Sequence, residues 1–448
     1  MVLTLLAFLA GAASGLLGAV FRLVLERADR FRDSALAWAH GEALVGFLCI
    51  IGSATAATAL AAWLVRRFSP LAAGSGIPQV EAELSGEQPP APLRLIPVKF
   101  LGGMLAMGAG LALGREGPSV QMGARLAQFV GTVFHRNRED CKVLLAAGAG
   151  AGLATAFNAP VAGAAFVLEE LARRFDTRTT IATLGASASA IAVARLLVRD
   201  APDFQVELLP YVGFGTLPLY LTLGVFVGLL GVAYNRTLLG VLAAVERLGR
   251  WSVEARAALI GVAVGVLAWF APDLVGGGDA LTQRALAGTE ALATLSFVFL
   301  LRFGLGALSY AARTPGGLFA PMLVLGSQSG LFFGILCCRW FPHLAPSPTP
   351  FAVVGIVAFF TAVVRAPLTG IVLVTEMTAS FTLLLPMLGA CFAAMAVPTL
   401  LGNPPIYDSL GSAHRGAKAG ETVSGSAAFM AGGDDEKPCS ARNRASDE

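Results

Sequence analysis

The stretch LGREGPSV, residues 113–120, places an arginine and a glutamate side by side between two glycines, with a proline directly after them. The residues before it, 101–113, carry no charge. Glycine and proline interrupt a helix, and proline is best tolerated in a helix's first turn. A charged side chain inside a membrane is costly and usually functional. If its surroundings lie in a membrane, this stretch predicts a broken helix that starts at a functional acid.

The composition is that of a membrane protein. Of the 448 residues, 56% are hydrophobic and 14% are charged, whereas soluble domains carry about 25% charged residues. A helix that crosses a bilayer needs ~20 mostly apolar residues. Segments that approach this length are 2–24, 43–65, 181–197, 217–233, 257–270, 292–311, 318–338 and the interrupted run 352–401. We therefore expect an all-α protein that crosses a lipid bilayer several times.

Other functional classes are disfavoured. The net charge of +3 is too small to suggest a nucleic-acid partner. The six cysteines and four histidines show no metal-ligand spacing, so we expect no metal and no cofactor. We also expect no enzymatic activity, because an intramembrane enzyme using Glu116 and Glu170 as an acid–base pair would lack a nucleophile and metal ligands. A scaffold without transport activity is a second weak alternative, because buried charge at broken helices is costly.

The chain contains an internal repeat. APVAGAAFVLEE (159–170) and APLTGIVLVTEM (366–377) share Ala, Pro, Gly, Val and Glu at matching positions, roughly 200 residues apart. GREGPSVQMG (114–123) and GLFAPMLVLG (317–326) share Pro and Gly at nearly the same offset. Two independent matches at one offset predict a duplicated unit. If each unit crosses the membrane an odd number of times, the two are inverted relative to each other, with substrate bound between them.

The repeat suggests a simple domain organisation. We expect one transmembrane domain over residues 1–410, made of halves 1–200 and 210–410. The remaining residues, 411–448, are rich in Gly, Ser, Ala and charge. Such a composition cannot bury enough apolar surface to fold, so we expect a disordered tail.

Three stretches predict broken helices. AGSGIPQVEAEL (73–84), GREGPSVQMG (114–123) and TPGGLFAPMLVLG (314–326) each place glycines before a helix start, with proline close to it. A helix N-terminus carries unpaired N–H groups and about half a positive charge. Irregular backbone at membrane depth is tolerated only where protein or a water-filled cavity satisfies it. Three such N-termini aimed at one place would bind an anion yet let it leave, as permeation requires.

Glu116 is the strongest candidate for a functional acid. The alternative is that Glu116 and Arg115 form an ion pair that only neutralises two interfacial charges. An ionised carboxylate near helix N-termini could itself occupy an anion site. Once protonated it would be neutral and could leave, admitting an anion. One residue would then gate the anion and carry the proton.

The acids after the first repeat motif allow two explanations. Glu169 and Glu170 could mark a helix end at water, paired with Arg173 and Arg174, or one of them could relay protons. Glu376 matches Glu169 in the repeat. This match favours a shared structural role for these two and leaves Glu170 as the acid with a possible function.

Several other polar positions have a structural alternative. Ser75, between two glycines, is either a turn residue or a hydroxyl donor to an anion. Phe319 either packs in the core or offers its backbone N–H to the same site. Tyr407 either belongs to an interfacial aromatic belt or lines the site. Arg302 and Arg365 are expected to pair with acids or to cap carbonyls.

Together these motifs resemble the CLC family of chloride channels and proton-coupled chloride transporters. GSGIP (74–78), GREGP (114–118) and GGLFAP (316–321) are similar to the three signature stretches around its anion pathway. They occur in the right order, with APVAGAAFVLEE between the second and third and a tyrosine near the end. The resemblance covers about residues 5–410, and it implies the CLC fold of two inverted repeats with broken and re-entrant helices.

The resemblance implies chloride as the bound substrate. The hydroxyls of Ser75 and Tyr407, and the backbone N–H groups of Leu318 and Phe319, would donate hydrogen bonds to the ion. The full set of implied chloride-binding residues is Ser75, Gly76, Ile77, Gly117, Leu318, Phe319 and Tyr407. The serine favours chloride over nitrate, because nitrate-preferring relatives carry proline there. The fluoride-exporting branch departs from these motifs.

The resemblance also implies proton coupling. Glu116 would be the gating glutamate and Glu170 the inner proton-transfer glutamate. Channels of the family commonly lack an acid at the second position, so both acids favour chloride/proton antiport. A passive voltage- or pH-gated chloride channel is the alternative. Arg115 would tune the electrostatics of the outer entrance, or it would only anchor the turn.

The family further implies the setting of the protein. We expect a homodimer with one pathway per subunit. Its ionic partners would be chloride and protons. We expect a multi-pass protein of a bacterial inner membrane, with both termini cytoplasmic. Residues 411–448 cannot form the paired C-terminal regulatory domains that many eukaryotic members carry.

Overall fold

The structure is a computed structural model that describes residues 2–198, 203–206 and 213–412. Within these residues the regular structure is helical, apart from two isolated β-bridges, which confirms the predicted fold class. The α-helices are α1 (Val2–Ala39), α2 (Ala43–Phe68), α3 (Ile77–Ser85), α4 (Leu95–Gly108), α5 (Glu116–Val133), α6 (Arg138–Phe157), α7 (Pro160–Phe166), α8 (Thr177–Ala194), α9 (Leu217–Glu246), α10 (Val253–Phe270), α11 (Asp279–Ala287), α12 (Leu292–Ala311), α13 (Phe319–Trp340), α14 (Thr349–Val364), α15 (Pro367–Thr378) and α16 (Leu384–Leu400). A π-helical turn, η3 (Val167–Leu171), extends α7.

Six helical stretches of the described residues are long and apolar enough to cross a membrane, so the protein is a multi-pass membrane protein. They are Val2–Phe68, Arg138–Phe157, Phe214–Glu246, Val253–Phe270, Leu292–Ala311 and Phe319–Trp340. Arg138–Phe157, which is α6, was missing from the predicted spans. Its interior is mostly alanine and glycine, whose small side chains give a weak apolar signal but allow close packing between helices.

The first helix continues well beyond the apolar segment predicted for it. Its second half is charged, and those charges pair along the helix. Arg22 contacts Glu26 at 3.2 Å, four residues on, and Arg32 contacts Asp29 at 2.7 Å, three residues back. Such spacings place side chains on the same face, so the charged half extends α1 to 38 residues.

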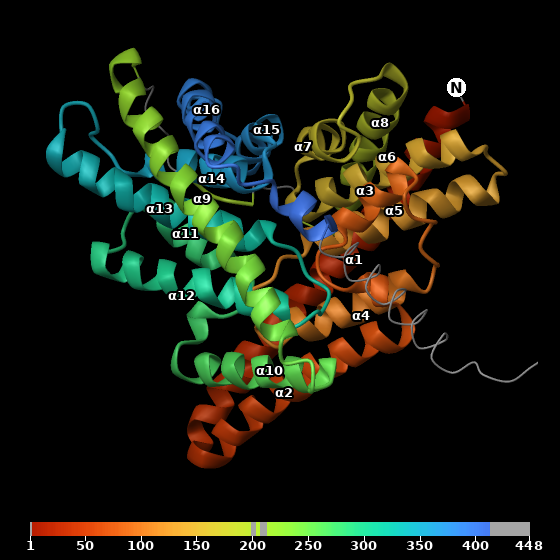
Figure 1. Cartoon of the computed structure of the whole chain (residues 1–448), viewed down its shortest axis with the longest axis horizontal. Helices are drawn as coiled ribbons and strands as arrows, with labels where there is room; N and C mark the ends of the chain where they lie inside the picture. Colours follow the sequence, from red (N-terminus) through yellow and green to blue (C-terminus); the bar gives the residue numbers. More distant parts are fainter. Residues whose placement is uncertain (1, 199–202, 207–212, 413–448) are drawn as a thin grey trace, which may run out of the picture.

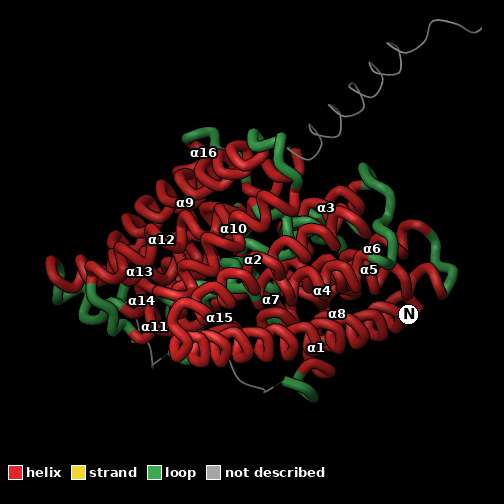
Figure 2. The backbone as a smooth tube through the Cα atoms, turned by 90° about the horizontal axis from the view of Figure 1, so that it is seen from below, coloured by secondary structure: helices red, strands yellow, loops and turns green. Residues whose placement is uncertain are grey.

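The two predicted halves occupy different sides of the molecule. In Figure 1, the red to yellow helices α1 and α3–α8 lie on one side, and the green to blue helices α9 and α11–α16 lie on the other. Helices α2 and α10 pack together at the bottom of this view. Figure 2 shows α1 along one edge with α8 beside it, and the two pack closely because the glycines of α1 leave room for the α8 backbone.

Matched glycines mark equivalent helix crossings in the two halves. A Cβ atom at Gly123 of α5 would collide with the backbone of Gly148 in α6. A Cβ atom at Gly326 of α13 would collide with the backbone of Gly355 and Ile356 in α14. Gly123 and Gly326 are the positions matched in the sequence repeat. The two crossings are therefore built alike, as the repeat predicts.

All three predicted helix breaks occur where the sequence places them. Helix α3 has nine residues, too few to cross a membrane, and α5 and α13 begin at Glu116 and Phe319. The loops before these helices are tied to one another by β-bridges, Gly74 to Pro315 and Gly114 to Gly317. These bridges gather the three helix N-termini in one place.

The tail predicted to be disordered, 411–448, lies outside the described residues from 413 on. Residues 411 and 412 still belong to a helical segment that begins at Ile406.

Candidate functional site

Glu116 lies fully buried where the two halves meet. It is the first residue of α5, and its Oε1 accepts a hydrogen bond of 3.2 Å from the backbone N–H of Ala320 in the first turn of α13. Its Oε2 has no hydrogen-bond partner among the residues that the structure describes. The carboxylate therefore rests on a helix N-terminus, where the helix dipole favours negative charge.

Two bridged glycines make the space for this carboxylate. Gly114 and Gly317 exchange backbone hydrogen bonds of 2.9 and 2.7 Å. A Cβ atom on either glycine would overlap the carboxylate of Glu116. The absence of side chains at these two positions thus lets the acid fold back against the start of α13.

Ser75 lies two residues before the start of α3, the remaining one of the three broken helices. Its hydroxyl accepts a hydrogen bond of 3.3 Å from the N–H of Ile77, so its own proton remains available to another acceptor. Gly76 between them has a φ of 85°, a left-handed conformation that favours glycine. Gly117 of α5 packs directly on Ser75, since a Cβ atom there would lie 2.9 Å from the Cβ of Ser75. The first and second motifs are therefore in contact.

Sequence reasoning missed two groups that hold this turn. Lys99 of α4 is fully buried, and its Nζ donates to the carbonyl oxygens of Ala72 and Gly74 at 3.1 and 2.8 Å. The hydroxyl of Tyr310 lies 3.4 Å from the N–H of Ser75. Lys99 stands in an apolar helix, LIPVKFLGG, so an intramembrane charge was a signal that could have found it.

Tyr407 is fully buried, which overturns the interfacial-belt explanation. Its ring stacks near that of Phe319, with centroids 6.4 Å apart, and its hydroxyl has no hydrogen-bond partner within the described part of the chain. Leu318 and Phe319, at the start of α13, are also fully buried. The structure therefore brings Tyr407 to the third motif, although the two lie far apart in the sequence.

Glu170 lies apart from this group, in the π-helical turn η3. It is 4% exposed, and its Oε1 has no hydrogen-bond partner among the described residues. An unpaired carboxylate oxygen in a buried position is costly unless the group is protonated or reaches water. Glu170 thus differs from Glu169, whose two carboxylate oxygens both accept hydrogen bonds.

Glu169 and Glu376 have the shared structural role that the repeat suggests. The carboxylate of Glu169 accepts from the N–H groups of Leu368 and Thr369, at 3.0 and 2.6 Å, at the start of α15. The carboxylate of Glu376 accepts from those of Val161 and Ala162, at 3.1 and 2.8 Å, at the start of α7. Each half thus supplies an acid that caps a helix of the other. The alternative that Glu169 pairs with the following arginines is wrong.

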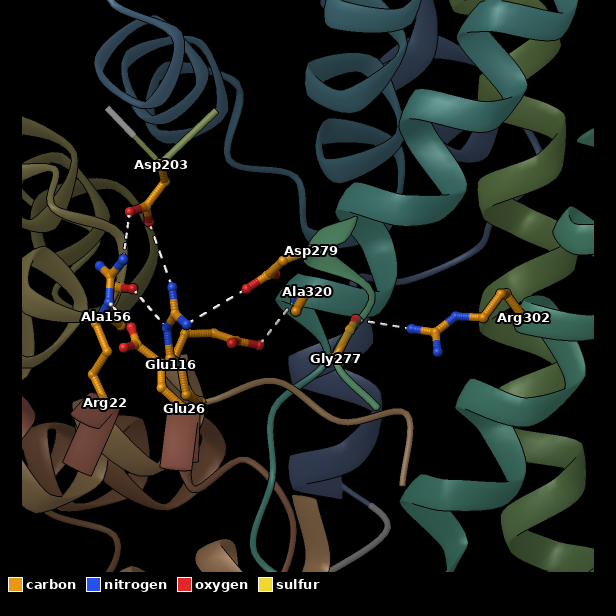
Figure 3. Close-up of polar contacts among 10 residues, drawn as sticks. Arg22, Glu26, Glu116, Ala156, Asp203, Gly277, Asp279, Arg302 and Ala320 are labelled. Carbon is orange, nitrogen blue, oxygen red and sulfur yellow. Dashed lines mark hydrogen bonds and ion pairs between the residues drawn. The ribbon is translucent and has the colours of Figure 1, made fainter. Parts of the chain in front are cut away.

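Arg115 turns away from Glu116, so the two do not form the neutralising pair considered above. Its Nε donates to the carbonyl of Ala156 at 3.0 Å, and its guanidinium lies 3.5 Å from Asp203 and from Asp279. Figure 3 shows Asp279 beside Ala320, which Glu116 faces, and Asp203 on the other side of the cluster. The guanidinium therefore both anchors the turn and joins separate segments.

A cavity of about 540 Å³ adjoins Glu116. Its lining includes Arg115, Glu116, Asp279 and Ala320, together with the charged part of α1. The buried carboxylate therefore borders this cavity, called the vestibule below, which charged side chains also line.

Arg302 and Arg365 cap carbonyls, as expected. Arg302 of α12 is 2% exposed and donates to the backbone oxygens of Leu274, Gly276 and Gly277 (Figure 3). Arg365 donates to backbone oxygens in the same way. Because Gly277 lines the vestibule, Arg302 fixes part of its wall.

The sequence model of the family described as voltage gated chloride channel matches residues 57–399. The chain belongs to this family. The match spans the three broken-helix motifs, so the CLC resemblance drawn from them is confirmed.

Curated CLC relatives match over most of their length. The H(+)/Cl(-) exchange transporter ClcA of Cronobacter sakazakii is 39% identical over 417 residues, which cover 91% of this chain and 88% of that protein. The protein of the same name from Vibrio cholerae is 37% identical over 413 residues, covering 90% and 88%.

Solved CLC structures share the fold. A slow cyanobacterial Cl⁻/H⁺ antiporter superposes with a TM-score of 0.89 at 33% identity, covering 92% of this chain and 97% of its own. A eukaryotic CLC transporter gives 0.77 at 25% identity, covering 91% and 74%. A CLC-type fluoride/proton antiporter, at 22% identity and a TM-score of 0.76, shares the fold alone. The helix order and broken helices described above are thus those of a CLC protein.

Proposed function

We propose that this CLC protein is a secondary active antiporter that exchanges chloride for protons across a membrane. The observation that carries the proposal is the buried carboxylate of Glu116, held on the N-terminus of α13 beside two further helix starts. The curated relatives named as H⁺/Cl⁻ exchange transporters support the same activity.

Chloride binds between the hydroxyls of Ser75 and Tyr407 and the N–H groups of Leu318 and Phe319. Both hydroxyl protons are available, since Ser75 accepts rather than donates in its turn and Tyr407 has no hydrogen-bond partner in the described residues. Gly76, Ile77 and Gly117 form the backbone on which Ser75 is held. This donor set carries no full positive charge, so it binds an anion and still releases it.

Glu116 is the gate and one of two proton carriers. As a carboxylate it takes the place of an anion at the start of α13. When a proton neutralises it, the helix dipole no longer holds it, and it leaves that place to chloride. Arg115 lies in the vestibule wall and tunes the electrostatics of this entrance, because its charge offsets those of Asp203 and Asp279.

Glu170 passes protons between Glu116 and the opposite aqueous side. Its carboxylate is buried yet has an unpaired oxygen, unlike that of Glu169, which is fully used in capping. Loading and unloading of this acid then connects the buried gate to water. The protein acts as a homodimer in a bacterial inner membrane, with both termini cytoplasmic.

The test is paired chloride and proton flux in proteoliposomes, with Glu116→Gln against the wild type. The neutral amide keeps the shape of the side chain but cannot exchange a proton, so chloride should move while proton coupling is lost. Glu170→Gln should also lose proton flux, and Glu246→Gln, at an exposed acid at the end of α9, is the matched control. Proton flux that persists unchanged in Glu116→Gln would overturn the assignment. A wild type that moves chloride without protons would favour the passive channel.

A further inference from the structure

Arg173 connects three elements around the proposed chloride site. One Nη nitrogen of Arg173 lies 3.1 Å from Glu81 of α3 and 2.5 Å from Asp408, and its Nε donates to the backbone oxygen of Glu170 at 3.2 Å. Asp408 directly follows Tyr407 in the helical segment 406–412. A single guanidinium thus joins the helix that starts at Ser75, the turn that carries Glu170 and the segment that carries Tyr407.

The backbone of Arg173 is shaped for this position. Its φ is 51°, in the left-handed region that most side chains avoid. A non-glycine residue in this region is held there at a cost, which the surrounding contacts must offset. The contacts to Glu81 and Asp408 are what the side chain gains from this conformation.

The contact to Asp408 bears on Tyr407 because the two residues are adjacent in the segment 406–412. The Tyr407 hydroxyl has no hydrogen-bond partner among the described residues, and its ring packs on Phe319. On the other side of the site, Ser75 lies just before α3, which carries Glu81 in its middle. The guanidinium therefore links the segment that carries Tyr407 to the helix that follows Ser75.

The contacts of Arg173 to Glu81 and Asp408 lie where water and salt can reach them. The side chain of Arg173 is 47% exposed, and it lines a cavity of about 360 Å³ together with Glu81, Lys142 and Arg174. Ion pairs between exposed side chains are weak and exchange readily with water and salt. The contact that spans the site can thus break and reform without unfolding the core.

We propose that Arg173 is a positioning residue that latches the Tyr407 segment to α3 and so closes the chloride site at its Glu170 end. This rests on the proposed function. With the latch closed, both hydroxyls reach one chloride. With the latch open, the Tyr407 segment moves away from Ser75, and the ion is held by fewer donors and leaves towards the cavity.

The test breaks the latch from each end and then rebuilds it. Arg173→Asn removes the guanidinium while keeping a residue that tolerates the left-handed backbone. Asp408→Ala removes one partner, and Arg173→Asp combined with Asp408→Arg reverses that pair, with Glu81→Gln added so that the new aspartate meets no like charge. Arg174→Gln is the matched control, because the neighbouring arginine pairs with Asp176 instead. The readouts are the chloride Kd by calorimetry, the chloride-to-proton flux ratio in proteoliposomes and the Tm in detergent.

Each single variant should weaken chloride binding ~2- to 5-fold, the size of one lost exposed ion pair, and should raise the number of chlorides moved per proton. The reversed pair should recover at least part of both changes, as coupling between two contacting residues requires. An unchanged Kd and flux ratio in Asp408→Ala overturns the latch. A lower Tm with an unchanged Kd, or no recovery in the reversed pair, also overturns it, because the arginine would then be merely structural. A wild type that moves no protons rejects the antiport proposal separately, since the chloride Kd still decides on the latch.

Discussion

At the scale of single residues, the site depends on a carboxylate that is buried without a cationic partner in contact. Glu116 turns to the N–H of Ala320, while Arg115 pairs with Asp203 and Asp279. A hydrogen bond to a charged group is worth ~1.5–3 kcal/mol. This stabilisation holds the charged form in place, and it disappears when the acid is protonated.

Gly317→Ala tests how closely the carboxylate must fit. The added methyl group would overlap Oε1 of Glu116, so we expect the hydrogen bond to Ala320 to break. Losing it should lower coupled proton flux about tenfold, from the energy of a charge-assisted hydrogen bond. Gly304→Ala is the control, because a Cβ atom there meets nothing within 4 Å. Flux equal to wild type in Gly317→Ala would contradict the placement of the carboxylate.

At the scale of elements, the two halves are joined by reciprocal caps. Glu376→Ala should leave the N–H groups of Val161 and Ala162 unpaired at the start of α7. The expected loss is ~1–2 kcal/mol of unfolding free energy, measured by denaturation in detergent. Glu169→Ala should cost a similar amount through α15, whereas Glu246→Ala, at an exposed acid, should cost less. Equal losses of unfolding free energy in all three variants would show that the two caps stabilise the fold no more than an exposed acid does.

A second prediction at this scale concerns pH and α8. Asp176 caps this helix, with its carboxylate accepting from the N–H of Thr179 at 2.9 Å. This hydrogen bond holds the pKa of Asp176 below its usual value in the folded protein. The resulting stabilisation is present above the ordinary pKa of an aspartate and is lost as the pH falls through the lower, folded pKa.

Asp176→Asn should therefore keep the cap, because an amide oxygen also accepts, but should reduce the loss of stability on acidification. The check is the Tm of both proteins between neutral and acidic pH. Parallel curves for the two would contradict a titrating cap.

The helix starts were predictable from the sequence because their signals are local. Glycines and a proline around Glu116 define the break within a few residues, and the match of Glu376 to Glu169 indicated their common role. The contacts of Tyr407 were not predictable, since Phe319 lies far away in the chain and only the folded backbone joins them. For Arg302 the capping of carbonyls was among the expectations, and the charge of Lys99 was a visible signal, but which backbone oxygens each one binds is fixed only by the fold.

At the scale of the whole molecule, both halves contribute residues to the candidate site. The first supplies Ser75, Glu116 and Glu170, and the second supplies Phe319 and Tyr407. The homodimer and the cytoplasmic termini stay predictions, and they follow from the family rather than from these contacts.

The most direct measurement is proton movement driven by a chloride gradient in proteoliposomes that contain the wild-type protein and no other ion pathway. An antiporter moves protons against their own gradient while chloride flows down its gradient, and it stops when the two driving forces balance. We predict such uphill proton flux in the wild type and its loss in Glu116→Gln. Chloride that equilibrates without moving protons would contradict the account.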